Sequence, residues 1–203
     1  MHIARPLKYK TVGQRRPLWG VGINDADYAV CYKDPTGKST KCPYYAVWAG
    51  ILERCFSKKL HEKRPTYAGC TLDPAWELFS NFKKWMESQD WQGKVLDKDL
   101  VSYHQKHYGP DTCLFISHEI NNLLTLRANF RGNLPLGVST TTMRGHTYFI
   151  ASCSFYGKQK RLGYFKEPEK AAEAYKTAKL SYIAELAAKE KDPRVRQALQ
   201  NLF

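Results

Sequence analysis

Apolar side chains in the first half of the chain recur with a helical period. Residues 43–57 are predicted to form a helix with a proline in its first turn, since apolar positions return every three or four residues. A second helix is predicted over residues 74–88. Its aromatic residues follow one another at every third position: Trp76, Phe79, Phe82 and Trp85. Such a stripe is typical of a hydrophobic core. Before these helices, loose alternation over residues 17–42 predicts a small β region.

The middle of the chain has a different pattern, with short apolar runs separated by turn residues. Residues 94–100 and 112–116 are predicted to be strands, with a turn at residues 108–111 between them. Ser117 is a suitable N-cap for a helix that runs to about Leu126. The predicted unit is therefore strand, loop, strand, helix.

The C-terminal part of the chain predicts three strands and then two helices. The first strand opens at Gly137, and the others cover residues 147–155 and 161–165. A long helix is predicted from Pro168 to about Lys189, and a short one begins at Asp192-Pro193. The long helix has small residues on one face, and we expect it to pack closely on the sheet.

Alternation along the second of these strands assigns its side chains to two faces. One face carries Phe149, Ala151 and Cys153, and the other carries Tyr148, Ile150, Ser152 and Ser154. The apolar residues of the last helices either pack into the core, which we expect, or form a dimer seam. These residues are Tyr182, Ile183, Leu186, Leu199, Leu202 and Phe203.

The predicted fold class is α+β, built from small mixed modules. Residues 1–90 are expected to hold a basic arm, a β hairpin and two aromatic-rich helices. Residues 91–126 are expected to form a ββα unit, and residues 127–135 a linker. Residues 136–203 are expected to form a three-stranded antiparallel sheet packed on a long helix, together with the C-terminal helices.

The distribution of charge along the chain indicates the class of partner that the protein binds. The 203 residues carry 32 Lys and Arg against 19 Asp and Glu, so the net charge is 32 − 19 = +13. The acids are absent from residues 1–23 and 127–166, both of which are basic. These stretches favour a polyanionic partner, most simply nucleic acid. No apolar run approaches the length of a membrane span, and the first residues lack a signal peptide, so we expect a cytoplasmic protein.

The chain contains six cysteines, none of them in a C-x-x-C pair. Reduced, half-buried thiols are the expected reading in a cytosolic protein. A zinc site built from Cys42, Cys55 and Cys70 is the alternative, although their spacing fits no common zinc knuckle.

Four motifs in residues 135–185 resemble the APETALA-type (ethylene-response-factor) DNA-binding domain. They are Leu136-Gly137-Val138, the pair Phe149 and Ala151, Leu162-Gly163-Tyr164-Phe165, and the run from Pro168 to Tyr175. In that family a helix backs a three-stranded sheet whose other face enters the major groove of double-stranded DNA. A strand can reach base edges in that groove with alternate side chains.

The resemblance implies a set of DNA-binding residues on or beside the sheet. They are Ser139, Thr141, Arg144, Tyr148, Ser152, Ser154, Lys158, Lys160, Arg161 and Tyr164. Among them, Arg144 and Arg161 are the candidates for base contacts, and Lys158 and Lys160 for phosphate contacts. The face has fewer arginines than plant members of the family, so the target sequence cannot be inherited from them.

The middle unit resembles a degenerate HNH nuclease motif, which phage and mobile-element homing endonucleases often join to APETALA-type domains. In this resemblance Asp97 and Asn121 correspond to the ligands of a divalent metal, Mg²⁺ or Mn²⁺. The general-base position holds Lys98, whose ammonium cannot accept a proton at neutral pH when exposed. Nearby histidines, His104 and His107, are the candidate replacements.

Three functions are therefore compatible with the sequence. The first is a sequence-specific, repressor-like DNA-binding protein that descends from a homing endonuclease, does not cleave and needs no cofactor. The second is a metal-dependent DNA-nicking endonuclease, and the third is an interaction protein for RNA or an acidic protein. Lys98, together with Thr112 at the position of the motif's middle Asn, favours the first. The sequence does not distinguish a monomer from a homodimer.

Overall fold

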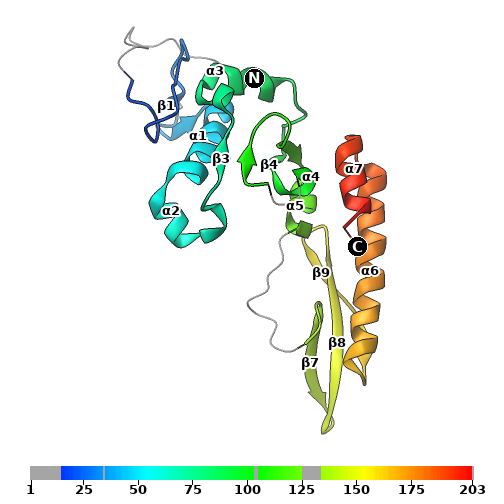
Figure 1. Cartoon of the computed structure of the whole chain (residues 1–203). Coiled ribbons are helices and arrows are strands. Elements are labelled where there is room, and N and C mark those ends of the chain that lie inside the picture. Colours follow the sequence, from blue (N-terminus) through cyan, green and yellow to red (C-terminus); the bar gives the residue numbers. More distant parts are fainter. Residues whose placement is uncertain (1–14, 34, 103–104, 125–133, 203) are drawn as a thin grey trace. The chain divides into compact units, whose positions relative to one another are not determined.

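The computed structural model divides the chain into two compact units, Met1–Ile116 and Ser117–Phe203 (Figure 1). It describes residues 15–33, 35–102, 105–124 and 134–202. Helices and small sheets occur together, so the expected α+β class is confirmed. The two units are described separately below as the N-terminal unit and the C-terminal unit.

The N-terminal unit combines short helices with three two-stranded sheets. Its elements are β1 (Cys31–Lys33), β2 (Ser39–Lys41), α1 (Pro43–Phe56), α2 (Lys58–Lys63), η2 (Pro65–Tyr67), β3 (Thr71–Leu72), η3 (Pro74–Glu77), α3 (Phe79–Glu87), β4 (Val95–Asp97), α4 (Asp99–Ser102), β5 (His107–Tyr108) and β6 (Leu114–Ile116). β1 pairs with β2 and β4 with β6, both antiparallel, whereas β3 and β5 are parallel. The helix predicted over residues 43–57 is confirmed as α1.

The single helix predicted over residues 74–88 is wrong, because the chain is extended at Leu78 and separates η3 from α3. Ile23 causes this break: its N–H donates to the carbonyl of Glu77, and its carbonyl accepts from the N–H of Phe79. The aromatic stripe nevertheless forms the core, with Trp76, Phe79 and Phe82 fully buried. The indole N–H of Trp48 in α1 donates to the carbonyl of Trp76 at 2.7 Å, which ties the two segments together.

The strand predicted over residues 94–100 is also shorter than expected, since β4 ends at Asp97. The Oδ2 atom of Asp97 accepts the N–H groups of Asp99 and Leu100 at 2.8 and 2.7 Å. A carboxylate in this position caps a helix start, so the chain turns into α4 instead of continuing as a strand.

The C-terminal unit contains a three-stranded antiparallel sheet in the order β7-β8-β9. Its elements are α5 (His118–Leu124), β7 (Val138–Met143), β8 (His146–Phe155), β9 (Lys158–Phe165), α6 (Pro168–Lys189) and α7 (Pro193–Gln200). The strands and the two last helices were expected, and α6 has the predicted bounds. β9 begins three residues earlier than predicted, directly after the tight turn at Tyr156-Gly157.

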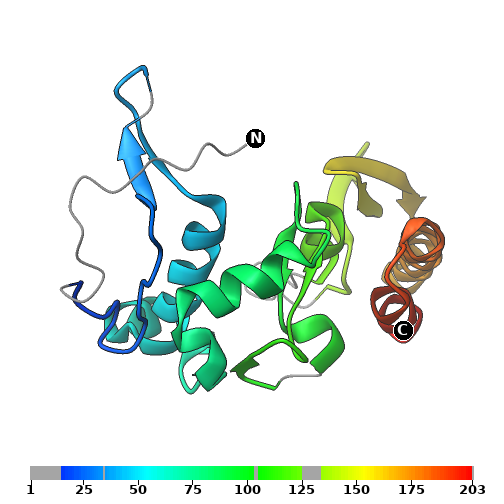
Figure 2. The same cartoon turned by 90° about the horizontal axis from the view of Figure 1, so that it is seen from above.

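Helix α6 runs along one face of this sheet and packs against all three strands (Figures 1 and 2). Ala151 in β8 and Ala171 in α6 are fully buried. Gly137 has a φ of +78°, and a Cβ there would lie 2.0 Å from the ring of Tyr175. The motifs that carry the family resemblance are therefore residues through which the helix and the sheet approach closely.

The expectation that the last helices pack into the core is confirmed where the structure describes them. The side chains of Tyr182, Ile183, Leu186 and Leu199 are buried, and Leu202 is half-buried. Phe203 lies outside the described residues.

Candidate nucleic-acid interface

The register of the sheet separates a helix-covered face from an open face. Thr141 pairs with Tyr148, and Ser152 pairs with Arg161. Paired residues lie on the same side of an antiparallel sheet, and Ala151 and Cys153 are buried on the side of α6. The open face therefore carries seven of the ten expected DNA-binding residues: Ser139, Thr141, Tyr148, Ser152, Ser154, Arg161 and Tyr164.

A β-bulge explains why Arg161 and Tyr164 share this face although they are three positions apart. Ala151 pairs with Gly163, while Ser152 pairs with Arg161, so the register shifts by one residue at Leu162. In a regular strand, side chains three positions apart would lie on opposite faces. The bulge brings the two back to one side.

Arg161 and Tyr164 contact each other on the open face. The Nη1 atom of Arg161 donates a hydrogen bond to the Tyr164 hydroxyl. The guanidinium carbon also lies 5.1 Å from the centre of the tyrosine ring. Tyr164 remains 45% exposed, and Arg161 is exposed as well. The guanidinium is thus held in place at the surface, which lowers the entropy that a base contact would cost.

The expected phosphate contacts lie elsewhere on the sheet. Lys158 pairs with Phe155 and Lys160 pairs with Cys153, so both occupy positions of the face that α6 covers. Both side chains are exposed, since they belong to the edge strand β9. They flank the open face instead of lying on it.

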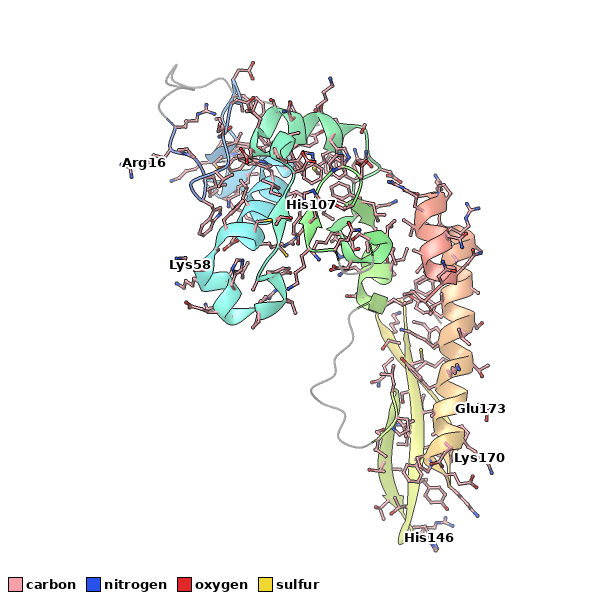
Figure 3. All side chains as sticks on the ribbon, in the orientation of Figure 1. Arg16, Lys58, His107, His146, Lys170 and Glu173 are labelled. Carbon is pink, nitrogen blue, oxygen red and sulfur yellow. The ribbon has the colours of Figure 1, made fainter. Side chains whose placement is uncertain are left out.

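Arg144 is at the tip of the turn between β7 and β8. Its φ of +51° and the +79° of Gly145 are typical of a two-residue hairpin turn. The side chain is exposed and makes no hydrogen bond or ion pair within the described residues. His146 follows it at the same end of the sheet (Figure 3).

Three further side chains of the open face were missed by the sequence prediction. They are Met143, His146 and Gln159. Gln159 pairs with Ser154, but the predicted third strand began only at residue 161. Extending the alternation back to the Tyr156-Gly157 turn would have found it.

In the middle of the chain, Asp97 serves the fold through its Oδ2 atom, which caps α4. Burial raises the pKa of this carboxyl group, and the two N–H donors offset only part of that effect. The charged form that a metal ligand needs is therefore less favourable here than in an exposed carboxyl group. Asn121 belongs to α5 in the other unit and is half-buried there.

Lys98 is not the exposed lysine that the sequence prediction assumed. Only 7% of it is exposed, and its ammonium group pairs with the carboxylate of Asp99 rather than with Asp97. It also lies 5.7 Å from the centre of the Tyr108 ring. A buried side chain that is already paired with a carboxylate and an aromatic ring is poorly placed to meet a water molecule as a general base.

Thr112 and His107 tie the loop between β5 and β6. The Thr112 hydroxyl donates to the carbonyl of His107 at 2.8 Å and accepts the N–H of Gly109 at 3.0 Å. Thr112 thus ties this loop as the middle Asn would in the resemblance. The Nδ1 atom of His107 lies 2.9 Å from the Thr71 hydroxyl, while His104 lies outside the described residues.

Within the described ranges, no three side chains of the His, Cys, Asp and Glu types lie together as a metal cluster. This applies to the zinc site considered for Cys42, Cys55 and Cys70. Burial raises the pKa of Cys55 to about 12 and that of Cys113 to about 11. Loss of the thiol proton, which zinc binding requires, is therefore less favourable at these two residues than at an exposed cysteine.

Comparison of the chain with protein-family models, curated proteins and solved structures gives no match. Among the helices in the described part of the chain, none is long and apolar enough to cross a membrane.

Proposed function

We propose that this protein binds double-stranded DNA sequence-specifically through the open face of the β7-β8-β9 sheet and does not cleave it. The observation that carries the proposal is the division of the sheet into two faces. α6 packs on one, and the other presents hydroxyl groups, an aromatic ring and the guanidinium of Arg161. No acidic residue occurs between residues 134 and 166, so nothing in this segment repels phosphate.

The dimensions of such a face suit the major groove. Side chains on one face of a strand recur every ~6.6 Å, close to two base steps of about 3.4 Å each. The groove is about 12 Å wide and admits a β ribbon. Arginine reads guanine, and serine, threonine and glutamine hydroxyl or amide groups read other base edges. The exposed lysines of the edge strand, Lys158 and Lys160, are then available to phosphates beside the groove.

The state of the middle unit supports binding without cleavage. Lys98 is buried and paired, and His107 is engaged by Thr71. The Oδ2 atom of Asp97 is already shared by two backbone N–H groups, and burial raises the pKa of this carboxyl group, so both make Asp97 a weaker ligand for Mg²⁺ or Mn²⁺ than a free carboxylate. We infer that this unit is the relic of an HNH site and that the protein acts as a repressor-like regulator.

One observation favours the alternative, a metal-dependent nicking endonuclease. Thr112 preserves the tied loop that the HNH resemblance implies. If cleavage survives, His104 or His107 would be the base, and the metal ligands would be Asp97 and Asn121.

The proposal is tested by comparing two cationic residues of β9. A preferred duplex is first selected from random DNA, and the affinities of Arg161→Ala and Lys160→Ala are then measured at several salt concentrations. We expect Arg161→Ala to lose about 1–3 kcal/mol on the selected duplex and to lose base preference at one position. Lys160→Ala should weaken binding to all sequences alike. It should also reduce the slope of log affinity against log salt concentration by about one, because one phosphate contact is lost.

Equal effects of the two variants on every sequence would contradict readout by the open face. A preference for single-stranded DNA or RNA of any sequence would contradict the proposed function itself.

A further inference from the structure

Three residues other than glycine adopt a positive φ: Trp19 at 56°, Arg144 at 51° and Tyr156 at 48°, counted over the described ranges. This conformation is unfavourable for bulky side chains and persists only where something compensates for it. Tyr156 is compensated within the fold. Its N–H donates to the Tyr182 hydroxyl at 2.8 Å, and its own hydroxyl donates to Glu185 at 2.7 Å.

Trp19 is held by the backbone hydrogen bonds of its own turn, which do not engage its side chain. Its side chain is 43% exposed, and its indole makes no hydrogen bond, ring contact or cation contact with another described residue. An indole that carries a hydrogen-bond donor and a large apolar surface normally has partners for both. Here the turn holds the indole at the surface without such partners among the described residues.

The turn that carries Trp19 is fixed at its base. Leu18 and Gly22 exchange hydrogen bonds, from the Leu18 N–H to the Gly22 carbonyl at 2.7 Å and in the reverse direction at 2.9 Å. Gly22 lies so close to the core that a Cβ there would be 2.3 Å from Leu52 and 3.0 Å from Trp48. The tip of the turn is therefore held rigidly, and a rigid aromatic group loses little entropy when it binds.

The charge around the turn indicates the chemistry of its partner. Residues 1–23 contain five cations and no acid. Arg15 fixes the approach to the turn, since its Nη1 atom donates to the carbonyl of Asn24 at 2.9 Å, while Arg16 extends away from the fold (Figure 3). The first acid along the chain, Asp25, is engaged by the N–H of Ser80 at the start of α3.

We propose that Trp19 stacks on a nucleobase of the bound DNA, with Arg16 at an adjacent phosphate. The inference rests on the proposed DNA-binding function, but it concerns the N-terminal unit and not the sheet. Indole rings stack well on bases of any identity, and aromatic or apolar side chains that enter a duplex unstack one base step. The contact would therefore add affinity and distort the DNA without reading a base itself.

The decisive variant is Trp19→Gly, since glycine adopts a positive φ without strain and removes the ring. Its thermal stability is expected to match or exceed that of the wild type. Its affinity for the selected duplex is expected to fall by at most about 5- to 150-fold, the range for aromatic residues that stack on single-stranded bases, because unstacking the duplex offsets part of the gain. Trp19→Phe should retain most of the affinity, because the aromatic face is kept.

The distortion is followed with 2-aminopurine placed at one position after another in the selected duplex, because its fluorescence increases when the base unstacks. One position should become brighter with the wild type and with Trp19→Phe, but not with Trp19→Gly. Leu78→Ala, which removes an exposed apolar side chain from the same unit, serves as the control and should leave the signal unchanged.

An unchanged affinity and an unchanged fluorescence pattern in Trp19→Gly would overturn the inference and would favour a protein partner for this turn. If Arg161→Ala weakens binding while Trp19→Gly does not, the inference fails and the proposed function stands. If the wild type binds no duplex, both fail together.

Discussion

Asp97 has a structural role that a sequence motif alone does not reveal. Its carboxylate ends β4 and starts α4 by accepting two N–H groups. Next to it, Lys98 is buried and contacts Asp99 and the Tyr108 ring. The HNH resemblance implies a histidine base at this position, and the lysine found there is instead buried and paired. The proposed loss of nuclease chemistry agrees with the structural contacts that these residues make.

The structural role of Asp97 predicts the effects of two substitutions at neutral pH. Asp97→Ala should lower the free energy of unfolding by about 1 kcal/mol, because the cap of α4 is lost. Asp97→Asn keeps an oxygen at the cap and should be close to the wild type. Urea unfolding followed by tryptophan fluorescence measures both, since all five tryptophans belong to the N-terminal unit.

The raised pKa of Asp97 also predicts a pH dependence. A carboxyl whose folded-state pKa lies above its ordinary value near 3.8 is stabilising below that value, and this contribution is lost as the pH rises through the folded-state pKa. The stability of the wild type relative to Asp97→Asn should therefore increase as the pH falls from 7 toward 4. A pH-independent difference would contradict this account. If Mg²⁺ stabilises the wild type but not Asp97→Asn, Asp97 would be identified as a metal ligand.

At the scale of elements, the close packing of the start of β7 against α6 stabilises the C-terminal unit. Gly137→Ala should lower its free energy of unfolding by more than about 3 kcal/mol, since it adds backbone strain to a clash with the Tyr175 ring. Gly145→Ala is the matched control. Gly145 has a similar φ of +79°, but no atom lies within 4 Å of an added Cβ. The Gly145→Ala substitution should lower the free energy of unfolding by about 1 kcal/mol. Far-UV circular dichroism during urea unfolding measures both, and equal losses would contradict the packing argument.

The elements that were predicted correctly are those with signals inside their own sequence. Helix α6 begins at Pro168 and follows a continuous helical pattern, so its bounds could be predicted. The break at Leu78 could not, because the aromatic stripe continues through it and its cause is a distant residue, Ile23. The end of β4 depends on a local cap that the apolar pattern does not reveal.

For the candidate site, alternation along β8 predicted the two faces of the sheet, including Tyr148 and Ser152 on the open side. It could not assign Lys158 and Lys160, because their side depends on where β9 begins. The contact between Arg161 and Tyr164 depends on the bulge at Leu162, which has no signal in the pattern.

At the scale of the whole molecule, the basic character of the chain is shared by both units. One acid-free stretch, residues 1–23, precedes the core of the N-terminal unit in the sequence, and the other, residues 127–166, includes the sheet of the C-terminal unit. A DNA-binding protein that contacts its target through both would protect more base pairs than a sheet alone can cover. The open face would supply base readout, and the turn at Trp19 would supply affinity and distortion.

The central claim, sequence-specific binding of double-stranded DNA without cleavage, is tested most directly by one combined measurement. Fragments of random and genomic duplex DNA are captured on the full-length protein in EDTA. Mg²⁺ or Mn²⁺ is then added, and all fragments are sequenced together with their nicked ends. We expect fragments that share a sequence to be enriched and to keep both strands intact. Metal-dependent breaks at one position, lost in His107→Ala or Asp97→Ala, would show that the protein is a nuclease. Capture without any shared sequence would contradict the reading of DNA by the sheet.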